Sequence, residues 1–112
     1  MAMALLASPS WGYKQEDLDK LAATNTCQEC DLAGADLHLA YLREANQTKA
    51  NLAKANLEKA ILTKANLAGA DLRGTVLTGA VLRDAKIDFA DFTKAKFCNT
   101  VMPDGQRIFK DC

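Results

Sequence analysis

Four cysteines and one histidine are the residues in this sequence whose types could serve metal binding or redox chemistry. Cys27 and Cys30 form a C-x-x-C motif, and Cys98 and Cys112 follow near the C-terminus. Such a set is compatible with a zinc site, a redox-active dithiol or two disulfides. Because His38 is the single histidine, a multi-histidine metal site is excluded, and we expect its side chain to be solvated.

Length and charge set limits on the class of protein. The chain has 112 residues, which suits one small domain, and its 14 basic residues balance its 14 acidic ones. Zero net charge argues against a nucleic-acid binder, and no apolar run reaches the roughly 18 residues that a membrane span needs. Residues 1–12 lack the basic region of a secretory signal, so we interpret them as an irregular terminus or the remnant of a signal.

A five-residue period organises most of the chain. From residue 30 the sequence divides into fourteen consecutive pentads without an insertion, and a partial fifteenth follows. The first position is nearly always alanine, and the third is large and apolar at every pentad except the one that contains Gln47. The apolar third positions are Leu32, Leu37, Leu42, Leu52, Leu57, Leu62, Leu67, Leu72, Leu77, Leu82, Ile87, Phe92 and Phe97.

This period fits neither a helix nor a continuous strand. A step of five rotates about 140° on a helix with 3.6 residues per turn, so no face would stay apolar. A strand requires a period of two. A strand broken by regular corners does fit, because the first and third residues of each pentad then share the inner face. Repeated corners produce coils, and coils stacked about 4.8 Å apart would bury the ladder of third-position side chains.

The repeated A-(D/N)-L-x-x motif over residues 30–104 resembles the pentapeptide repeat family. The resemblance implies an all-β solenoid, a right-handed quadrilateral β-helix of about three and a half coils with four pentads per coil. The opening CQECDLAGADL and the closing FCNTVMPDG look most like cyanobacterial and plastid-lumen members.

The flanking segments are expected to cover the ends of this array. We divide the chain into an N-terminal segment with a helical cap (1–29), the repeat body (30–104) and a C-terminal tail (105–112). The pattern of apolar residues predicts a short helix over 13–23. Phe92 and Phe97 are expected to plug the last coil, and Ile108 with Phe109 to fold back over it.

The expected stack of coils determines which cysteines can lie close together. The two pairs would lie at opposite ends of the array, more than about 10 Å apart, whereas a Zn–S bond is about 2.3 Å long. Pairing within each end, Cys27–Cys30 and Cys98–Cys112, is therefore favoured. Stable disulfides would imply an oxidising compartment such as the periplasm or the thylakoid lumen, with the cytoplasm as the alternative.

Three departures from the repeat are candidate interaction features. Gln47 is polar at a central position, and we expect it to bond nearby backbone or the N-terminal cap, with a ligand contact as the alternative. Fifth-position lysines in four consecutive pentads should form a ring around the coil and not a basic patch. These lysines are Lys49, Lys54, Lys59 and Lys64.

The third departure is an apolar column at the second position, which normally holds Asp or Asn. Its members recur in steps of twenty residues and are Tyr41, Ile61, Val81 and Val101. We interpret this stripe as β-branched packing on a flat sheet, as a face covered by a chain terminus, or as a surface for a partner or for self-association.

No nucleophile–base pair, phosphate-binding loop or metal cluster is apparent, so we expect no catalytic residues, no cofactor and no metal. The sequence favours a non-enzymatic structural or protein-interaction module. One alternative, implied by the resemblance, is a DNA mimic that inhibits a topoisomerase. It is disfavoured because residues 30–104 carry nine acidic and ten basic side chains. The other alternative is a C-x-x-C redox protein.

Overall fold

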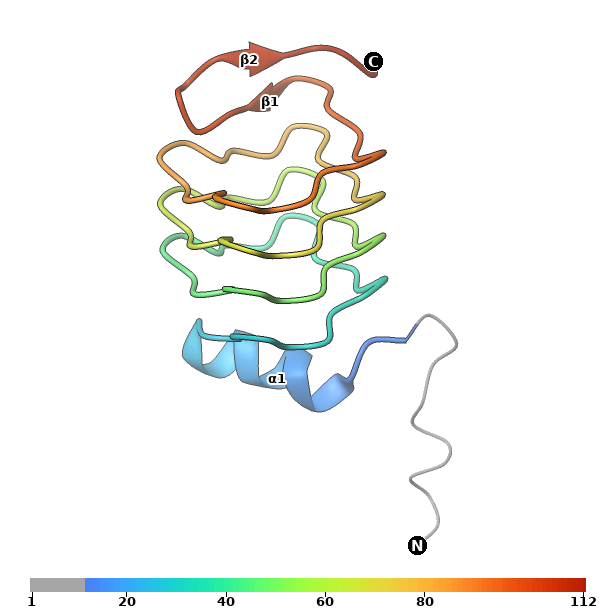
Figure 1. The fold of residues 1–112 in the computed structure, drawn as a ribbon, viewed down its shortest axis with the longest axis vertical. Helices are drawn as coiled ribbons and strands as arrows, with labels where there is room; N and C mark the ends of the chain where they lie inside the picture. Colours follow the sequence, from blue (N-terminus) through green and yellow to red (C-terminus); the bar gives the residue numbers. More distant parts are fainter. Residues whose placement is uncertain (1–11) are drawn as a thin grey trace, which may run out of the picture.

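The described part of the chain forms a stack of coils, with a helix packed against the N-terminal end of the stack (Figure 1). The computed structural model describes residues 12–112. Helix α1 spans Gln15–Thr24, and two short strands, β1 (Thr100–Val101) and β2 (Arg107–Ile108), form an antiparallel pair at the other end. Between them, the coils pair through single parallel bridges.

Helix α1 lies against the first coil. It begins two residues later than the sequence predicts, because Lys14 keeps an extended backbone, and it ends where Asn25 turns left-handed with φ 59°. The carboxylate of Asp17 accepts a hydrogen bond from the Asp31 N–H at 2.7 Å, and Leu21 is buried. The helix therefore joins the coil through both a charge-assisted hydrogen bond and apolar burial.

Each pentad turns one corner. The N–H of Ala35 donates to the Leu32 carbonyl at 3.0 Å, and the same bond recurs through most of the repeat. The fifth residue of every pentad has a positive φ, between 56° and 73°, as the third residue of a type II turn does. Asp or Asn at the second position supports the corner, since Asn51 Oδ1 accepts from the Ala53 N–H at 3.0 Å.

The coil has four sides, because residues twenty apart pair while the chain turns every five. Asp31 pairs with Asn51, and Tyr41 pairs with Ile61, both in parallel. The first such pair is Thr26 with Asn46, so the stacked body starts four residues before the boundary expected at residue 30. Hydrogen bonds between coils are short; the Leu57 N–H, for example, donates to the Val76 carbonyl at 2.9 Å.

Small and large side chains alternate in the core, as an inward-facing first and third position requires. The central leucines from Leu52 to Leu82 are fully buried, together with most first-position alanines. At the C-terminal end the burial weakens. Phe92 and Phe97 are half-buried, with ring centroids 5.8 Å apart.

Candidate functional site

The cysteines form two disulfides, Cys27–Cys30 and Cys98–Cys112, which are the pairings favoured by the sequence. Cys27 and Cys30 are buried between α1 and the first coil, whereas Cys112 is exposed. Over residues 12–112, no group of three or more His, Cys, Asp or Glu side chains could hold a metal ion. Burial of the C-x-x-C disulfide does not favour the redox interpretation, because thiol exchange needs an accessible sulfur.

The expectation for Gln47 was wrong. The side chain is completely buried, yet neither its Oε1 nor its Nε2 has a hydrogen-bond partner within residues 12–112. Its neighbours in the column are Cys27, twenty residues earlier, and Leu67, twenty residues later, and neither offers a good partner. The surrounding backbone groups are already engaged between coils, as the Gln47 N–H is with the Asn66 carbonyl.

The four lysines lie at the corners of four successive sides, so they form no patch. The stems of Lys49, Lys54 and Lys59 pack over glycines twenty residues later, whereas Asp84 stands at that position for Lys64. A Cβ added at Gly79 would lie 3.1 Å from Lys59 Cγ, and one at Gly69 would lie 3.2 Å from Lys49 Cγ. This pairing was not predicted, although the sequence carries its signal as lysine followed by glycine at a spacing of twenty. It gives three of the four lysines a packing role.

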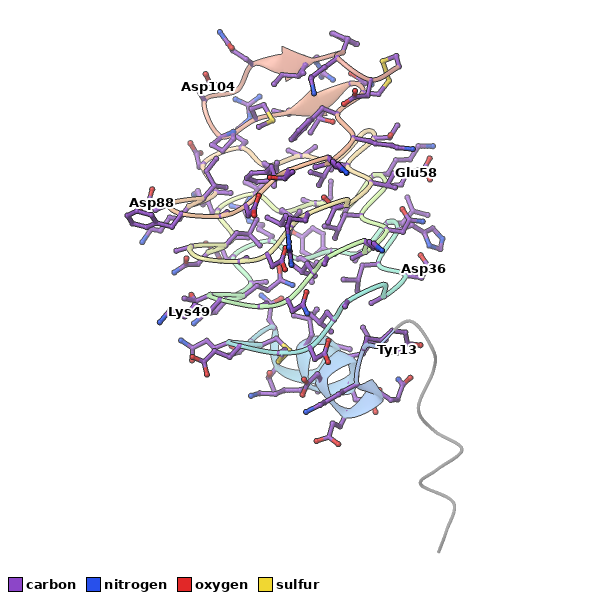
Figure 2. The ribbon with its side chains drawn as sticks, turned by 45° about the vertical axis from the view of Figure 1, so that its right-hand side comes forward. Tyr13, Asp36, Lys49, Glu58, Asp88 and Asp104 are labelled. Carbon is purple, nitrogen blue, oxygen red and sulfur yellow. A yellow bond between two sulfur atoms is a disulfide. The ribbon has the colours of Figure 1, made fainter. Side chains whose placement is uncertain are left out.

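Charged contacts are few and exposed. The Asp71 carboxylate binds the Arg73 guanidinium through two bonds of 2.8 and 2.7 Å, and this hydrogen bonding lowers the pKa of Asp71. His38 Nδ1 lies 2.7 Å from Asp36 Oδ1, and the hydrogen bond lowers the pKa of Asp36. Figure 2 shows Asp36 and Glu58 on one side of the ribbon, and Lys49 and Asp88 on the other.

The apolar stripe is a continuous column, because Tyr41 pairs with Ile61, Ile61 with Val81, and Val81 with Val101. Its exposure is graded. Tyr41 is 72% exposed, Ile61 and Val81 are half-buried, and Val101 is only 5% exposed. Val101 is therefore not part of an open surface, because the chain reverses after it and β2 pairs Arg107 with Val101.

A hollow adjoins the exposed end of the stripe. Tyr41, Leu37 and Leu42 from the first coil, with Leu18 and Ala22 from α1, line a cavity of about 350 Å³. Its lining is mainly apolar, so the stripe and the hollow together form one apolar region at the junction of helix and coil.

The repeat pattern and the coil identify the class of protein. The family model described as pentapeptide repeats matches residues 26–63, 48–79 and 60–99, with eight copies. The chain belongs to the pentapeptide repeat family. Membership implies a right-handed β-helix, which agrees with the four-sided coil.

Several solved structures are similar to this chain. The pentapeptide repeat protein Rfr23 of the cyanobacterium Cyanothece 51142 is 23% identical with a TM-score of 0.47, over 76% of this chain and 78% of that one. HetL of Nostoc, involved in heterocyst differentiation regulation, is 26% identical with a TM-score of 0.37. This match covers 74% of this chain and 51% of HetL, so the chain spans about half the length of that relative.

A plant protein is also similar. A pentapeptide repeat protein of the Arabidopsis thaliana thylakoid lumen is 21% identical with a TM-score of 0.32, over 86% of this chain and 73% of that one. No curated protein matches the chain. Among the helices of residues 12–112, none has the length and apolarity to cross a membrane.

Proposed function

We propose that this protein is a non-enzymatic interaction module that binds another protein through Tyr41, Ile61 and Val81. The main support is that these residues form an aligned apolar column at the second position of the pentad, where the fold itself favours Asp or Asn. Asn51 and Asp71 show the structural role of that position, because each carboxamide or carboxylate oxygen accepts an N–H two residues later. A valine or isoleucine gives up that bond, so the requirements of the corner do not explain the stripe.

The neighbouring hollow supports the same surface. Tyr41 belongs both to the stripe and to the lining of the cavity beside α1. An apolar side chain from a partner could enter the hollow while the partner backbone or side chains cover Ile61 and Val81. Interfaces commonly combine an anchor in a pocket with a surrounding apolar area.

Replacement of Ile61 and Val81 together by asparagine tests the proposal. Asparagine restores the residue that supports the corner elsewhere, so the variant should fold while its stripe becomes polar. Retention of partner proteins from a native extract should fall at least about tenfold, equivalent to about 1.4 kcal/mol. Asn66→Asp, at the same register on another side, should leave retention unchanged.

Sedimentation velocity on the same variants tests self-association. An unchanged set of retained proteins together with an unchanged sedimentation coefficient in the stripe variant would rule out this surface.

The flanks and the compartment complete the proposal. Helix α1 serves as a cap that keeps the N-terminal end of the stack, which has about three and a half coils, from pairing with other chains.

The two disulfides support an oxidising compartment, the periplasm or the thylakoid lumen. Thiol alkylation of protein trapped in its native compartment tests this, and four free cysteines there would contradict it.

A further inference from the structure

At the C-terminal end of the coil, no strand from residues 12–112 covers two of the four sides. In every earlier coil, the N–H groups of the third and fifth residues donate to the next coil, as those of Leu67 and Gly69 do. In the last coil, and within residues 12–112, the N–H groups of Ile87, Phe89 and Phe92 have no hydrogen-bond partner.

Carbonyl groups along the same edge are also open. Those of Ala85 and Ala90 accept no hydrogen bond from the described chain, whereas the equivalent Ala80 carbonyl accepts from the Val101 N–H. The open edge therefore offers a carbonyl acceptor before and an N–H donor after Lys86, and the same arrangement around Asp91. An edge of this kind is a template for strand addition.

The other two sides are already covered by the tail. Strand β2 pairs antiparallel with β1, and further on the Asp111 N–H donates to the Phe97 carbonyl at 2.7 Å. The tail thus occupies the layer that a second copy, approaching coil to coil, would have to enter. A single extended segment lying beside the tail meets no such obstacle.

Apolar side chains mark this open edge as well. Ile87, Met102 and Ile108 line a cavity of about 390 Å³ between the last coil and the tail. Phe89 is 96% exposed and holds a φ of 62°, a conformation that glycine adopts at the equivalent corner residue Gly69. The fifth residue of every pentad has a positive φ, so the distinguishing feature of Phe89 is its exposed ring, which gains no burial within the chain. A partner that covers the ring would explain its exposure.

We propose that the edge formed by residues 85–94 binds an extended peptide segment of another protein as one half of a further coil. The segment runs parallel to the edge, with large apolar residues five apart that stack on Ile87 and Phe92. An antiparallel segment would instead place them over the small Ala85 and Ala90. This surface is separate from the stripe and stands independently of the function proposed above.

Charge specifies the segment further. The residue that bridges to Lys86 should be acidic, and the residue five positions later, which bridges to Asp91, should be basic, because directly opposed residues of opposite charge stabilise strand pairs. The recognised segment therefore begins with an acidic residue followed by a large apolar one. Two linking residues and one small residue come next, and a basic residue followed by a second large apolar one ends it.

Two synthetic peptides of identical composition test the proposal by fluorescence anisotropy with the full chain. AELAGAKLAG carries the proposed charge order, and AKLAGAELAG reverses it. We expect saturable binding of the first peptide, about tenfold tighter than that of the second. Lys86→Glu should abolish the preference, whereas Lys96→Glu, at the same register on a side covered by the tail, should preserve it.

Amide hydrogen exchange locates the bound peptide. On binding, exchange at Ile87, Phe89 and Phe92 should slow relative to the free protein. No saturable binding at millimolar peptide, equal binding of the two peptides, or slowed exchange elsewhere would overturn the proposal. So would a dimer in sedimentation velocity that Lys86→Glu dissociates, because it would assign the edge to a second copy.

Discussion

Gln47 occupies a position that every other complete pentad from residue 30 fills with a large apolar side chain. Its amide is buried and has no hydrogen-bond partner in the described part of the chain, and an unpartnered buried polar group costs about 1–3 kcal/mol. We therefore predict that Gln47→Leu raises the free energy of unfolding by about that amount, measured by urea denaturation. Leu67→Gln, the reverse change in the same column, should lower it, and a less stable Gln47→Leu protein would contradict this explanation.

The Asp71–Arg73 pair predicts a pH dependence. Hydrogen bonding from the guanidinium lowers the pKa of Asp71 in the folded chain. Its contribution to stability is therefore present above the ordinary pKa of an unfolded aspartate, about 3.9, and is lost as the pH falls through the lower folded pKa. NMR titration of the carboxyl carbon should show that Arg73→Ala raises the pKa of Asp71, and an unchanged titration would contradict the pairing.

Helix α1 and the tail are the elements that do not repeat, and their stability rests on a few contacts. Leu21 is the buried residue of α1, with 3% of its surface exposed. Leu21→Ala should lower the free energy of unfolding by about 2–5 kcal/mol. Leu39→Ala, at a leucine that is 64% exposed, is the matched control and should change it by less than about 0.5 kcal/mol. Equal effects would show that α1 does not stabilise the coil.

The two disulfides differ in access, so they should differ in reactivity. Cys27 and Cys30 are buried, whereas Cys98 is half-buried and Cys112 is exposed. Mild dithiothreitol under native conditions should reduce Cys98–Cys112 first, as read by alkylation and peptide mass mapping. Earlier or simultaneous reduction of Cys27–Cys30 would contradict the described packing of α1 on the first coil.

For the whole molecule, the five-residue period carries most of the structural information. It predicts which side chains face inward and which residues stack twenty apart, because a periodic coil makes these consequences of spacing alone. Deviations at the two ends were harder to predict. Thr26 already pairs with Asn46, but the pentad around it begins with Asn25 and centres on Cys27, so it lacks the alanine and leucine that reveal the others.

The path of the tail and the surroundings of one side chain also lay beyond the pattern. Burial of Val101 depends on where residues 105–112 return, and these residues do not repeat. The amide of Gln47 is unpartnered because its neighbours among residues 12–112 offer no free hydrogen-bonding group, and the spacing of residues in the sequence does not reveal this. The candidate surfaces divide in the same way: the stripe follows from the period, while the open edge over 85–94 follows from the tail.

Hydrogen bonds between residues about twenty apart are the feature on which the coil, the stripe and the open edge all depend. Scalar couplings across hydrogen bonds, measured by NMR, detect them directly. We predict correlations from the amide nitrogen of Leu57 to the carbonyl carbon of Val76 and from that of Lys59 to that of Thr78. Correlations to carbonyl carbons four residues earlier in the repeat, as in a helix, would contradict the account.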